Sequence, residues 1–268
     1  MYFKDGAWWI KSTEFGDSKD RVVIKSDTSF TYLAPDIAYH RDKYKDNPFM
    51  LINLWGPDHH GYIDRLKASI KALGLNESIL KIIIVQHVSL IKDGKKIDMS
   101  TRKGTFYTLR ELIQEVGVDV ARFFYLLRKV STPLEFNIDL AKLQSKENPV
   151  YYIQYAYARI QSIFEKIENF SQEDIINRRD FTEEEMNLIR FLFRFEEILN
   201  MCVKLLDPYF LADYLLNLAG IFHRFYERNP VLKAPSKIKE RRILICKATS
   251  NVLNCGLGLL GISSPQRM

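Results

Sequence analysis

The segment Asp98–Gly104 reads DMSTRKG and combines hydroxyl side chains with the adjacent cations Arg102 and Lys103. It closely follows Ile82–Ile91, an apolar run of the kind that buried strands show. Hydroxyl groups and cations can stabilise the negative charge that develops on phosphoryl oxygens during phosphoryl transfer. The alternative is a solvated surface turn, which is the ordinary role of a basic loop.

The elements that would position this loop form a strand–helix–strand pattern. Phe49–Trp55 and Ile82–Ile91 are dense apolar runs that predict central strands buried on both faces. Between them, Tyr62–Leu73 has an apolar stripe at helical spacing that ends at a glycine. This order predicts a βαβ unit with parallel strands, and ligands are expected at the carboxyl ends of such strands. Gly56–Gly61 and the loop Asp98–Gly104 would both lie there.

Shorter patterns precede this unit. The β-branched and aromatic residues of Arg21–Lys25 and Ser29–Tyr32 predict a hairpin. Pro35 predicts a helix start that places Asp36 in the first turn, with Tyr32 just ahead of the helix. A carboxylate at that position complements the helix dipole.

After Gly104 we expect helices and no further strands. Tyr107–Val116 and Val118–Lys129 predict two short helices that are separated at Gly117. Pro149 fits the first turn of a long helix, where its missing N–H group is not needed.

Further long helices complete a bundle of about four. Thr182 and Glu185 have the spacing of a capping box, and apolar positions continue from there to Leu206 in one predicted helix. Leu211–Tyr226 and Arg241–Leu260 predict the other two.

The composition narrows the class of protein. The chain has 268 residues with 39 Lys and Arg against 33 Asp and Glu, and its formal charge of +6 favours a polyanionic partner or reflects an ordinary basic bias. Its three cysteines include no CxxC pair, so we expect a reducing compartment and no disulfide framework. No apolar run is long enough to span a bilayer and no secretory signal pattern is present, so we expect a cytoplasmic protein without a membrane partner.

His59 and His60 have no Cys or carboxylate at metal-site spacing, so we expect no metal site.

The basic loop resembles the KMSKS loop of class I aminoacyl-tRNA synthetases, because a strand, Gly-Lys-Lys, Met-Ser-x-basic and Gly follow in the same order. The resemblance extends along the whole chain to one family, the arginyl-tRNA synthetases. The segments that carry it are DGAWWIKSTEFGDSKDRVVIKSD, TYLAPDIAYHRDKY, WGPDHHGYIDRLKASIKALG, VSLIKDGKKIDMSTRKGTF, TLRELIQEVGVDVARFFYLLR, ENPVYYIQYAYARIQSI and LLGISSPQRM. The MSTRKG form of the loop occurs in that family. Asp98 replaces the first lysine of the motif and leaves Lys95, Lys96, Arg102 and Lys103 as candidate phosphate-facing cations.

The resemblance implies an α/β plus all-α fold. Residues 1–106 would form the C-terminal half of a Rossmann-type catalytic domain with a parallel sheet, and residues 107–148 a helical segment that contacts the tRNA stem. Residues 149–268 would form an α-helical anticodon-binding domain. The implied activity is that of an arginine–tRNA ligase, which uses ATP, as its Mg²⁺ complex, to activate L-arginine and attach it to tRNA(Arg).

Roles for individual residues also follow from the resemblance. The catalytic loop would comprise Met99, Ser100, Thr101, Arg102 and Lys103. The arginine substrate would contact Tyr32, Asp36 and His59. The ATP would contact Asp58, Gln86, His87 and Lys96. The anticodon stem and loop would contact Tyr152, Tyr155, Arg159, Arg224, Tyr226 and Arg228.

Physical chemistry supports two of these roles and leaves alternatives open. A permanently charged guanidinium needs a fixed carboxylate such as Asp36, and unpaired RNA bases stack on aromatic side chains and contact Arg. The alternative for Asp36 is a helix-end residue, and the alternative for His87 is a core histidine with satisfied hydrogen bonds. Each tyrosine at helical spacing has the alternative of a place in the core.

One family signature is absent from this sequence, namely the HIGH-type sequence after the first strand of the Rossmann domain. His59–Gly61 is only superficially similar, because it follows a later strand. We therefore expect a C-terminal portion of the enzyme that is inactive without its missing N-terminal part. Apolar surface that is core in the complete domain is expected to be exposed. The alternative is a non-enzymatic tRNA-binding module whose Rossmann portion is a scaffold.

Overall fold

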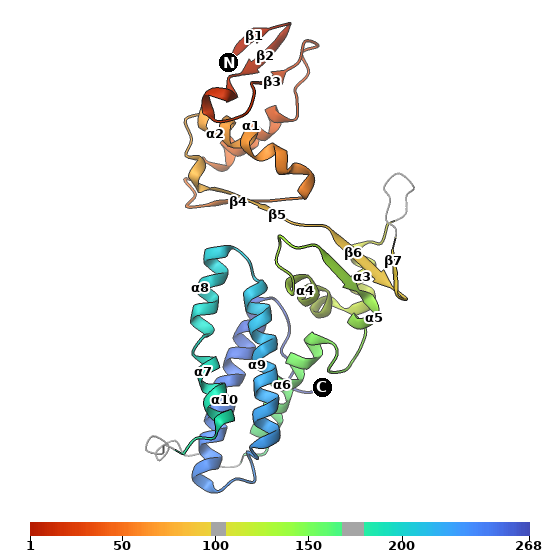
Figure 1. Cartoon of the computed structure of the whole chain (residues 1–268), viewed down its shortest axis with the longest axis vertical. Coiled ribbons are helices and arrows are strands. Elements are labelled where there is room, and N and C mark those ends of the chain that lie inside the picture. The colour runs from red at the N-terminus through yellow and green to blue at the C-terminus, as the bar shows by residue number, and fades with distance from the viewer. Residues whose placement is uncertain (98–105, 168–179) are drawn as a thin grey trace. The chain divides into compact units, whose positions relative to one another are not determined.

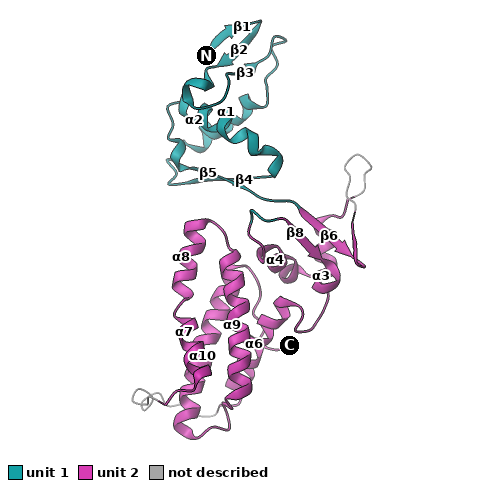
Figure 2. Ribbon diagram, viewed as in Figure 1, with its two compact units in different colours: residues 1–87, 130–132 teal, residues 88–129, 133–268 magenta. Residues whose placement is uncertain are grey.

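The computed structural model describes residues 1–97, 106–167 and 180–268 of the chain (Figure 1). The chain divides into two compact units (Figure 2). Unit 1 comprises residues 1–87 and 130–132, and unit 2 comprises residues 88–129 and 133–268. The domain boundaries at 106 and 148 that the resemblance implies are not tested by this division and stay predictions.

Unit 1 begins with an antiparallel sheet. Its strands pair in chain order and are β1 (Tyr2–Lys4), β2 (Ala7–Ile10) and β3 (Arg21–Ile24). A 3₁₀ helix, Ser12–Phe15, connects β2 to β3. The predicted hairpin is confirmed only in part, because its second arm pairs with β3 through a single bridge between Ile24 and Phe30. The main partner of β3 is β2.

The predicted βαβ unit is confirmed. Its elements are β4 (Leu51–Trp55), the 3₁₀ helix Pro57–Tyr62, α2 (Ile63–Ala72), the 3₁₀ helix Glu77–Ile79 and β5 (Leu80–Ile84). The strands β4 and β5 are parallel, with Leu51 opposite Leu80 and Trp55 opposite Ile84. Just after α2, Gly74 has φ of +73°, a left-handed conformation that glycine adopts without a side-chain clash.

Within unit 1, the two parallel strands are covered on one face only, which corrects the prediction of strands buried on both faces. Leu66 and Ile70 of α2 are fully buried against the face that carries Leu80. On the opposite face of β4, the side chains of Ile52 and Leu54 are 44% and 66% exposed. The density of an apolar run does not show whether both faces have a covering layer within the same chain.

The predicted strand Ile82–Ile91 is two strands, which corrects the sequence interpretation. β5 ends at Ile84, and β6 (Val88–Lys92) begins a different sheet in unit 2. Between them the backbone N–H of Val85 donates to the Trp55 carbonyl at 2.7 Å, and the N–H of Gln86 donates to the Val130 carbonyl at 2.9 Å. The chain thus leaves β5 just before the polar pair Gln86 and His87, which interrupts the apolar run between the two strands.

Unit 2 begins with a small mixed sheet. Its central strand, β6, pairs antiparallel with β7 (Lys95–Lys96) and parallel with β8 (Leu134–Asn137). The prediction that no strand follows Gly104 is therefore wrong. The strand β8 was missed because its alternation of apolar and polar residues extends over only four positions. Helices α3 (Leu109–Val116), α4 (Val118–Leu126) and α5 (Ile138–Ala141) accompany this sheet. The predicted separation of the first two at Gly117 is confirmed, and its φ is +84°.

The rest of unit 2 is a helical bundle (Figure 1). Its helices are α6 (Pro149–Phe164), α7 (Glu183–Leu192), α8 (Phe195–Leu205), α9 (Tyr209–Arg228) and α10 (Ser236–Leu259). Pro149 opens α6 and the Thr182 capping box opens α7, as predicted. The predicted single helix from Thr182 to Leu206 is instead α7 and α8, which are separated at Phe193 and Arg194.

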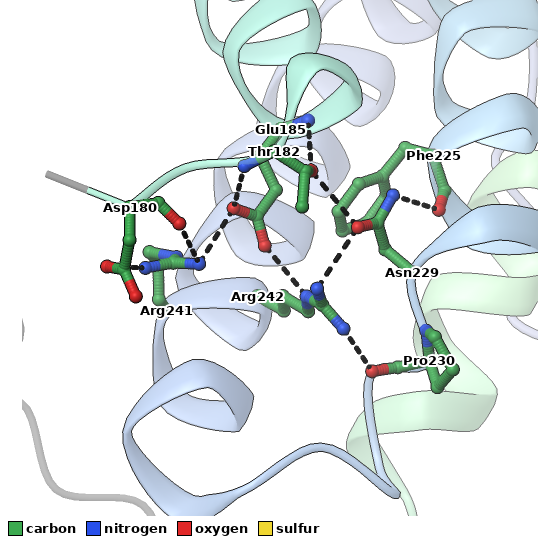
Figure 3. Close-up of polar contacts among 8 residues, drawn as sticks. All are labelled: Asp180, Thr182, Glu185, Phe225, Asn229, Pro230, Arg241 and Arg242. Atoms are coloured by element: carbon green, nitrogen blue, oxygen red, sulfur yellow. Dashed lines mark hydrogen bonds and ion pairs between the residues drawn. The ribbon is translucent and has the colours of Figure 1, made fainter.

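A buried ion-pair network connects the start of α7, the end of α9 and the N-terminal part of α10 (Figure 3). Glu185, in the first turn of α7, is 0% exposed. Its carboxylate accepts from Nη2 of Arg241 at 2.9 Å and from Nε of Arg242 at 2.7 Å, both from α10. Arg242 also donates to the Asn229 side chain at 3.0 Å, at the end of α9. The network therefore joins segments that are more than 40 residues apart in the sequence.

Candidate functional site

In unit 1, Tyr32 and Asp36 lie at the start of α1 (Leu33–Lys43), as the sequence predicts. The Tyr32 side chain is 90% exposed and Asp36 is half-buried. Asp36 forms no ion pair with any described residue. A half-buried carboxylate without a cation partner can accept the hydrogen bonds of a guanidinium.

One hydrogen bond within α1 and two from its last turn to Asn53 hold this helix against β4. The buried ring of His40 contacts the Asp36 carbonyl through Nδ1 at 2.7 Å and Nδ2 of Asn53 through Nε2 at 2.7 Å. Lys43 donates to Oδ1 of Asn53 at 3.0 Å. Since the Asp36 carbonyl accepts and the Asn53 amide donates, the pattern assigns the proton of a neutral His40 ring to Nδ1.

Tyr62 is a residue that the sequence analysis missed at this site. Its hydroxyl is buried beside Asp36 and makes no hydrogen bond of standard geometry. Burial raises the pKa of Tyr62, and the negative charge of Asp36 raises it further. The Arg65 guanidinium lies 4.7 Å from the centre of the Tyr62 ring. Tyr32, Tyr62 and Arg65 line one hollow of about 260 Å³.

Three of the four residues predicted to contact ATP, Asp58, Gln86 and His87, follow the carboxyl ends of β4 and β5. Nε2 of His87 lies 3.9 Å from Oδ1 of Asp58, and both side chains are exposed. The exposure of His87 excludes the alternative of a core histidine. Gln86 and His87 stand between strands and not within one, which corrects their predicted place. His59 packs against Trp55 with ring centres 5.9 Å apart, and Trp55 also contacts Tyr62 at 5.9 Å.

The basic loop divides between described and undescribed residues. Lys96 lies in β7 of unit 2, opposite Ile91, and is exposed. Met99, Ser100, Thr101, Arg102 and Lys103 lie outside the described residues.

In unit 2, four predicted RNA-contacting residues meet between α6 and α9. The Arg159 guanidinium lies 4.5 Å from the Tyr155 ring centre and 4.6 Å from that of Tyr226. Arg159 also donates to the Tyr155 hydroxyl at 2.8 Å. His223 joins the cluster, with its ring centre 4.5 Å from that of Tyr152. We call these residues, Tyr152, Tyr155, Arg159, His223 and Tyr226, the aromatic groove.

Burial lowers the pKa of His223, and the positive charge of Arg159 lowers it further. The Tyr152 carbonyl, 3.1 Å from Nε2 of His223, acts in the opposite direction. The ring is therefore mostly neutral at pH 7, and from its buried position it packs against the rings of Tyr152 and Tyr155 without adding charge. Tyr157, on the same helix, is buried in the core.

The last residues of the chain complete the aromatic groove, a contribution that the sequence analysis missed. Tyr151, Tyr152 and Tyr155 line a hollow of about 720 Å³ together with Arg267 and Met268. A second hollow of about 460 Å³ shares Tyr155, Arg267 and Met268 and adds Arg159 and Tyr226. Residues 261–268 have no helical or strand periodicity, so the sequence contained no signal for where they pack.

Arg224 and Arg228 do not lie in the aromatic groove. Nη1 of Arg228 donates to Oε1 of Glu184 on α7 at 2.8 Å. Arg224 lines a separate hollow with residues of α7. The predicted RNA-contacting residues are therefore distributed over two seams of α9, one toward α6 and one toward α7.

The described part of the chain adds two observations on ligands and membranes. It contains no group of three or more His, Cys, Asp or Glu side chains that could hold a metal ion. Within residues 1–97, 106–167 and 180–268, no helix has the length and apolar character needed to cross a bilayer.

Two family models match the chain. Residues 2–124 match the catalytic domain of the class I tRNA synthetases of the (R) type. Residues 153–268 match the DALR anticodon-binding domain. The first match contains the candidate arginine and ATP residues, and the second contains most of the aromatic groove.

Curated relatives match over the whole chain. The chain is 45% identical to an arginine–tRNA ligase of Aquifex aeolicus over 276 residues, and 48% identical to one of Vesicomyosocius okutanii over 269 residues. Each match covers 100% of this chain and 47% of the relative, so the chain spans about half the length of the curated relatives it matches. The solved structure of Thermus thermophilus arginyl-tRNA synthetase shares the fold, with a TM-score of 0.82 at 21% identity over 98% of this chain and 54% of that one.

Proposed function

Because the chain belongs to the arginyl-tRNA synthetase family, with the class I catalytic match followed by the DALR match, we propose that it is the portion of an arginine–tRNA ligase that binds the anticodon arm of tRNA(Arg) and supplies one part of the arginine and ATP site. The observation that carries this proposal is the aromatic groove, where a guanidinium is held between two tyrosine rings. Flat rings and a fixed Arg are the groups on which unpaired RNA bases stack.

The catalytic contribution that we propose is positioning and charge stabilisation. In the first step, the arginine carboxylate attacks the α-phosphate of ATP and pyrophosphate leaves. In the second, a terminal ribose hydroxyl of the tRNA takes the arginyl group and AMP leaves. Neither step requires a protein nucleophile. Mg²⁺ would enter with the ATP.

Individual residues have defined tasks in this proposal. Asp36, which has no ion-pair partner among the described residues, would accept the substrate guanidinium, with Tyr32 and His59 as further contacts. Asp58, Gln86, His87 and Lys96 would contact ATP. The loop residues 99–103 would stabilise the leaving pyrophosphate, as the family resemblance implies.

We expect the chain alone to give no arginine- and tRNA-dependent ATP–pyrophosphate exchange. The half of the Aquifex aeolicus ligase that this chain does not match is the natural complement to add, and exchange is expected to appear in the mixture. The exposed apolar face of β4, with Ile52 and Leu54, favours such completion over a scaffold role, because apolar strand faces of α/β sheets are normally covered. Exchange by the chain alone would contradict the need for a complement.

Replacing Tyr155 with alanine is expected to weaken binding of an arginine-accepting tRNA about tenfold, since one base–aromatic stack contributes about 1–3 kcal/mol. Binding of a tRNA with a scrambled anticodon should change little, so the ratio of the two affinities should fall toward one. Phe193→Ala is the matched control, because Phe193 is an 83% exposed aromatic residue of the same bundle outside the groove. Fluorescence anisotropy with both RNAs measures these affinities. Equal wild-type affinity for the two RNAs would remove the support for anticodon recognition.

A further inference from the structure

A third hollow of the bundle, separate from the two at the aromatic groove, lies on the seam between α7 and α9. It has a volume of about 310 Å³ and is lined by Asn187, Arg190, Phe191, Arg194, Ile221 and Arg224. We call Arg190, Arg194 and Arg224 the arginine triad. All three residues are exposed.

The spacing of the lining residues fixes the hollow on one face of each helix. On α7 and just beyond its end, residues 187, 190, 191 and 194 recur every three or four positions, and residues 221 and 224 do the same on α9. The aromatic groove uses His223 and Tyr226, which point from α9 toward α6. The two hollows are therefore on different sides of α9.

Along this seam, the arginine near the end of α9 is paired with a carboxylate, whereas the arginines of the triad have no carboxylate partner among the described residues. Arg228 is paired with Glu184 at 2.8 Å. One turn away, no guanidinium of the arginine triad forms a hydrogen bond or an ion pair with any described residue. Three like charges around one hollow repel each other, and a bound anion would relieve that repulsion.

The lining also has the chemistry of a phosphodiester site. Guanidinium groups present planar forks of N–H donors that match phosphate oxygens, and Asn187 adds an amide donor. Arg194 lies 5.5 Å from the centre of the Phe191 ring, which restricts where its guanidinium can point. Phe191 and Ile221 add apolar surface to the lining. Such a surface can contact the sugar or base of a nucleotide, but it offers no hydrogen bonds to a hydrated inorganic ion.

We propose that the arginine triad binds backbone phosphates of an RNA strand, independently of the anticodon sequence. This inference rests on the proposed function for its choice of RNA as the partner, and it adds a second site to that of the aromatic groove. Because phosphates are the same in every RNA, the triad contributes affinity and salt dependence but no discrimination between anticodons.

The test uses the double variant Arg190→Gln/Arg224→Gln of the full chain. Its binding to the arginine-accepting tRNA and to the scrambled-anticodon tRNA is expected to weaken about tenfold by the same factor, with the slope of log K against log salt reduced by about one to two. The control, Lys204→Gln/Lys247→Gln, removes two exposed charges elsewhere on the bundle and should leave the slope closer to that of the wild type. Since the triad makes no ion pairs within the described part of the chain, thermal unfolding of the variants should match that of the wild type.

The outcomes separate the two sites. An unchanged affinity and salt slope in the Arg190→Gln/Arg224→Gln variant, or an equal loss in the lysine control, overturns the inference and leaves the aromatic groove unaffected. A loss of RNA affinity in the Arg variant but not in the lysine control supports the triad. If the wild type also binds the two RNAs equally, anticodon recognition is contradicted while the triad remains supported. Inorganic phosphate serves as the further probe: if it raises the melting temperature of the wild type only, while both RNAs bind the variant normally, the site binds free phosphate and the assignment to RNA is wrong.

Discussion

Replacing Glu185 with glutamine is expected to destabilise the helical bundle by about 3–5 kcal/mol, the range for breaking a buried ion pair from one side. The carboxylate of Glu185 is fully buried and compensates two guanidiniums, those of Arg241 and Arg242. A neutral amide leaves the Arg242 guanidinium without its carboxylate partner and leaves Arg241 with only the more exposed carboxylate of Asp180. The amide also offers one acceptor oxygen in place of two, so at least one of the Arg hydrogen bonds is lost.

Glu184→Gln is the matched control for this prediction. Glu184 is the preceding residue of the same helical turn, and its partner Arg228 is largely exposed to solvent. An exposed ion pair contributes little to stability, so the control should unfold like the wild type. Denaturant unfolding followed by far-UV circular dichroism reports the bundle, whereas the three tryptophans, Trp8, Trp9 and Trp55, all lie in unit 1 and report that unit by fluorescence. Equal unfolding midpoints for the two variants would show that the network contributes no more than a surface pair.

Replacing Asp36 with asparagine is expected to reduce the affinity for L-arginine about 100-fold, because truncating one partner of a desolvated charge pair costs about 2–5 kcal/mol. The amide retains the shape of the carboxylate but carries no charge to oppose the guanidinium. Its NH₂ group also places a donor against the donors of the substrate. The helix itself should remain intact, since the His40 hydrogen bond uses the Asp36 backbone carbonyl and not its side chain.

An NMR titration of the chain with L-arginine measures this effect and reaches weak affinities. Citrulline, whose side chain is a neutral analogue of the guanidinium, should not bind the wild type. Asp42→Asn is the control, because Asp42 is an exposed carboxylate on the same helix that is paired with Lys45. An arginine affinity unchanged by Asp36→Asn would leave Asp36 as a helix-end residue that complements the dipole.

Local signals in the sequence predicted the ends of elements better than their pairing. Pro149, Gly117 and the Thr182 capping box act within a few residues, and each marks a helix end in the structure. The exit of the chain from β5 at Val85 depends instead on a hydrogen bond to Val130, which is 44 residues away from Gln86. The short strand β8 likewise exists because β6 is present to pair with it.

The candidate site shows the same division between local and distant information. Tyr155 and Arg159 are one helical turn apart, so their proximity follows from the sequence. The family resemblance then suggested RNA as the ligand that they contact. The capping box of Thr182 and Glu185 could likewise be predicted from its spacing. The ion pairs of Glu185 with the two arginines of α10 could not, because those arginines lie 56 and 57 residues further along the chain. Tyr62 and Met268 were missed for this reason also: their roles arise only from what packs beside them.

The path of the chain between the two units determines how they can be dissected. Residues 130–132 belong to unit 1 although the segments on both sides of them belong to unit 2, and Val130 receives the hydrogen bond of Gln86. A single cut at residue 87 would therefore leave a returning loop attached to unit 2 without its hydrogen-bond donor. Gene fragments that aim to express the helical bundle should also keep α4, because Phe123 belongs to the same buried core and Arg122 donates to the Gly261 carbonyl at 2.7 Å.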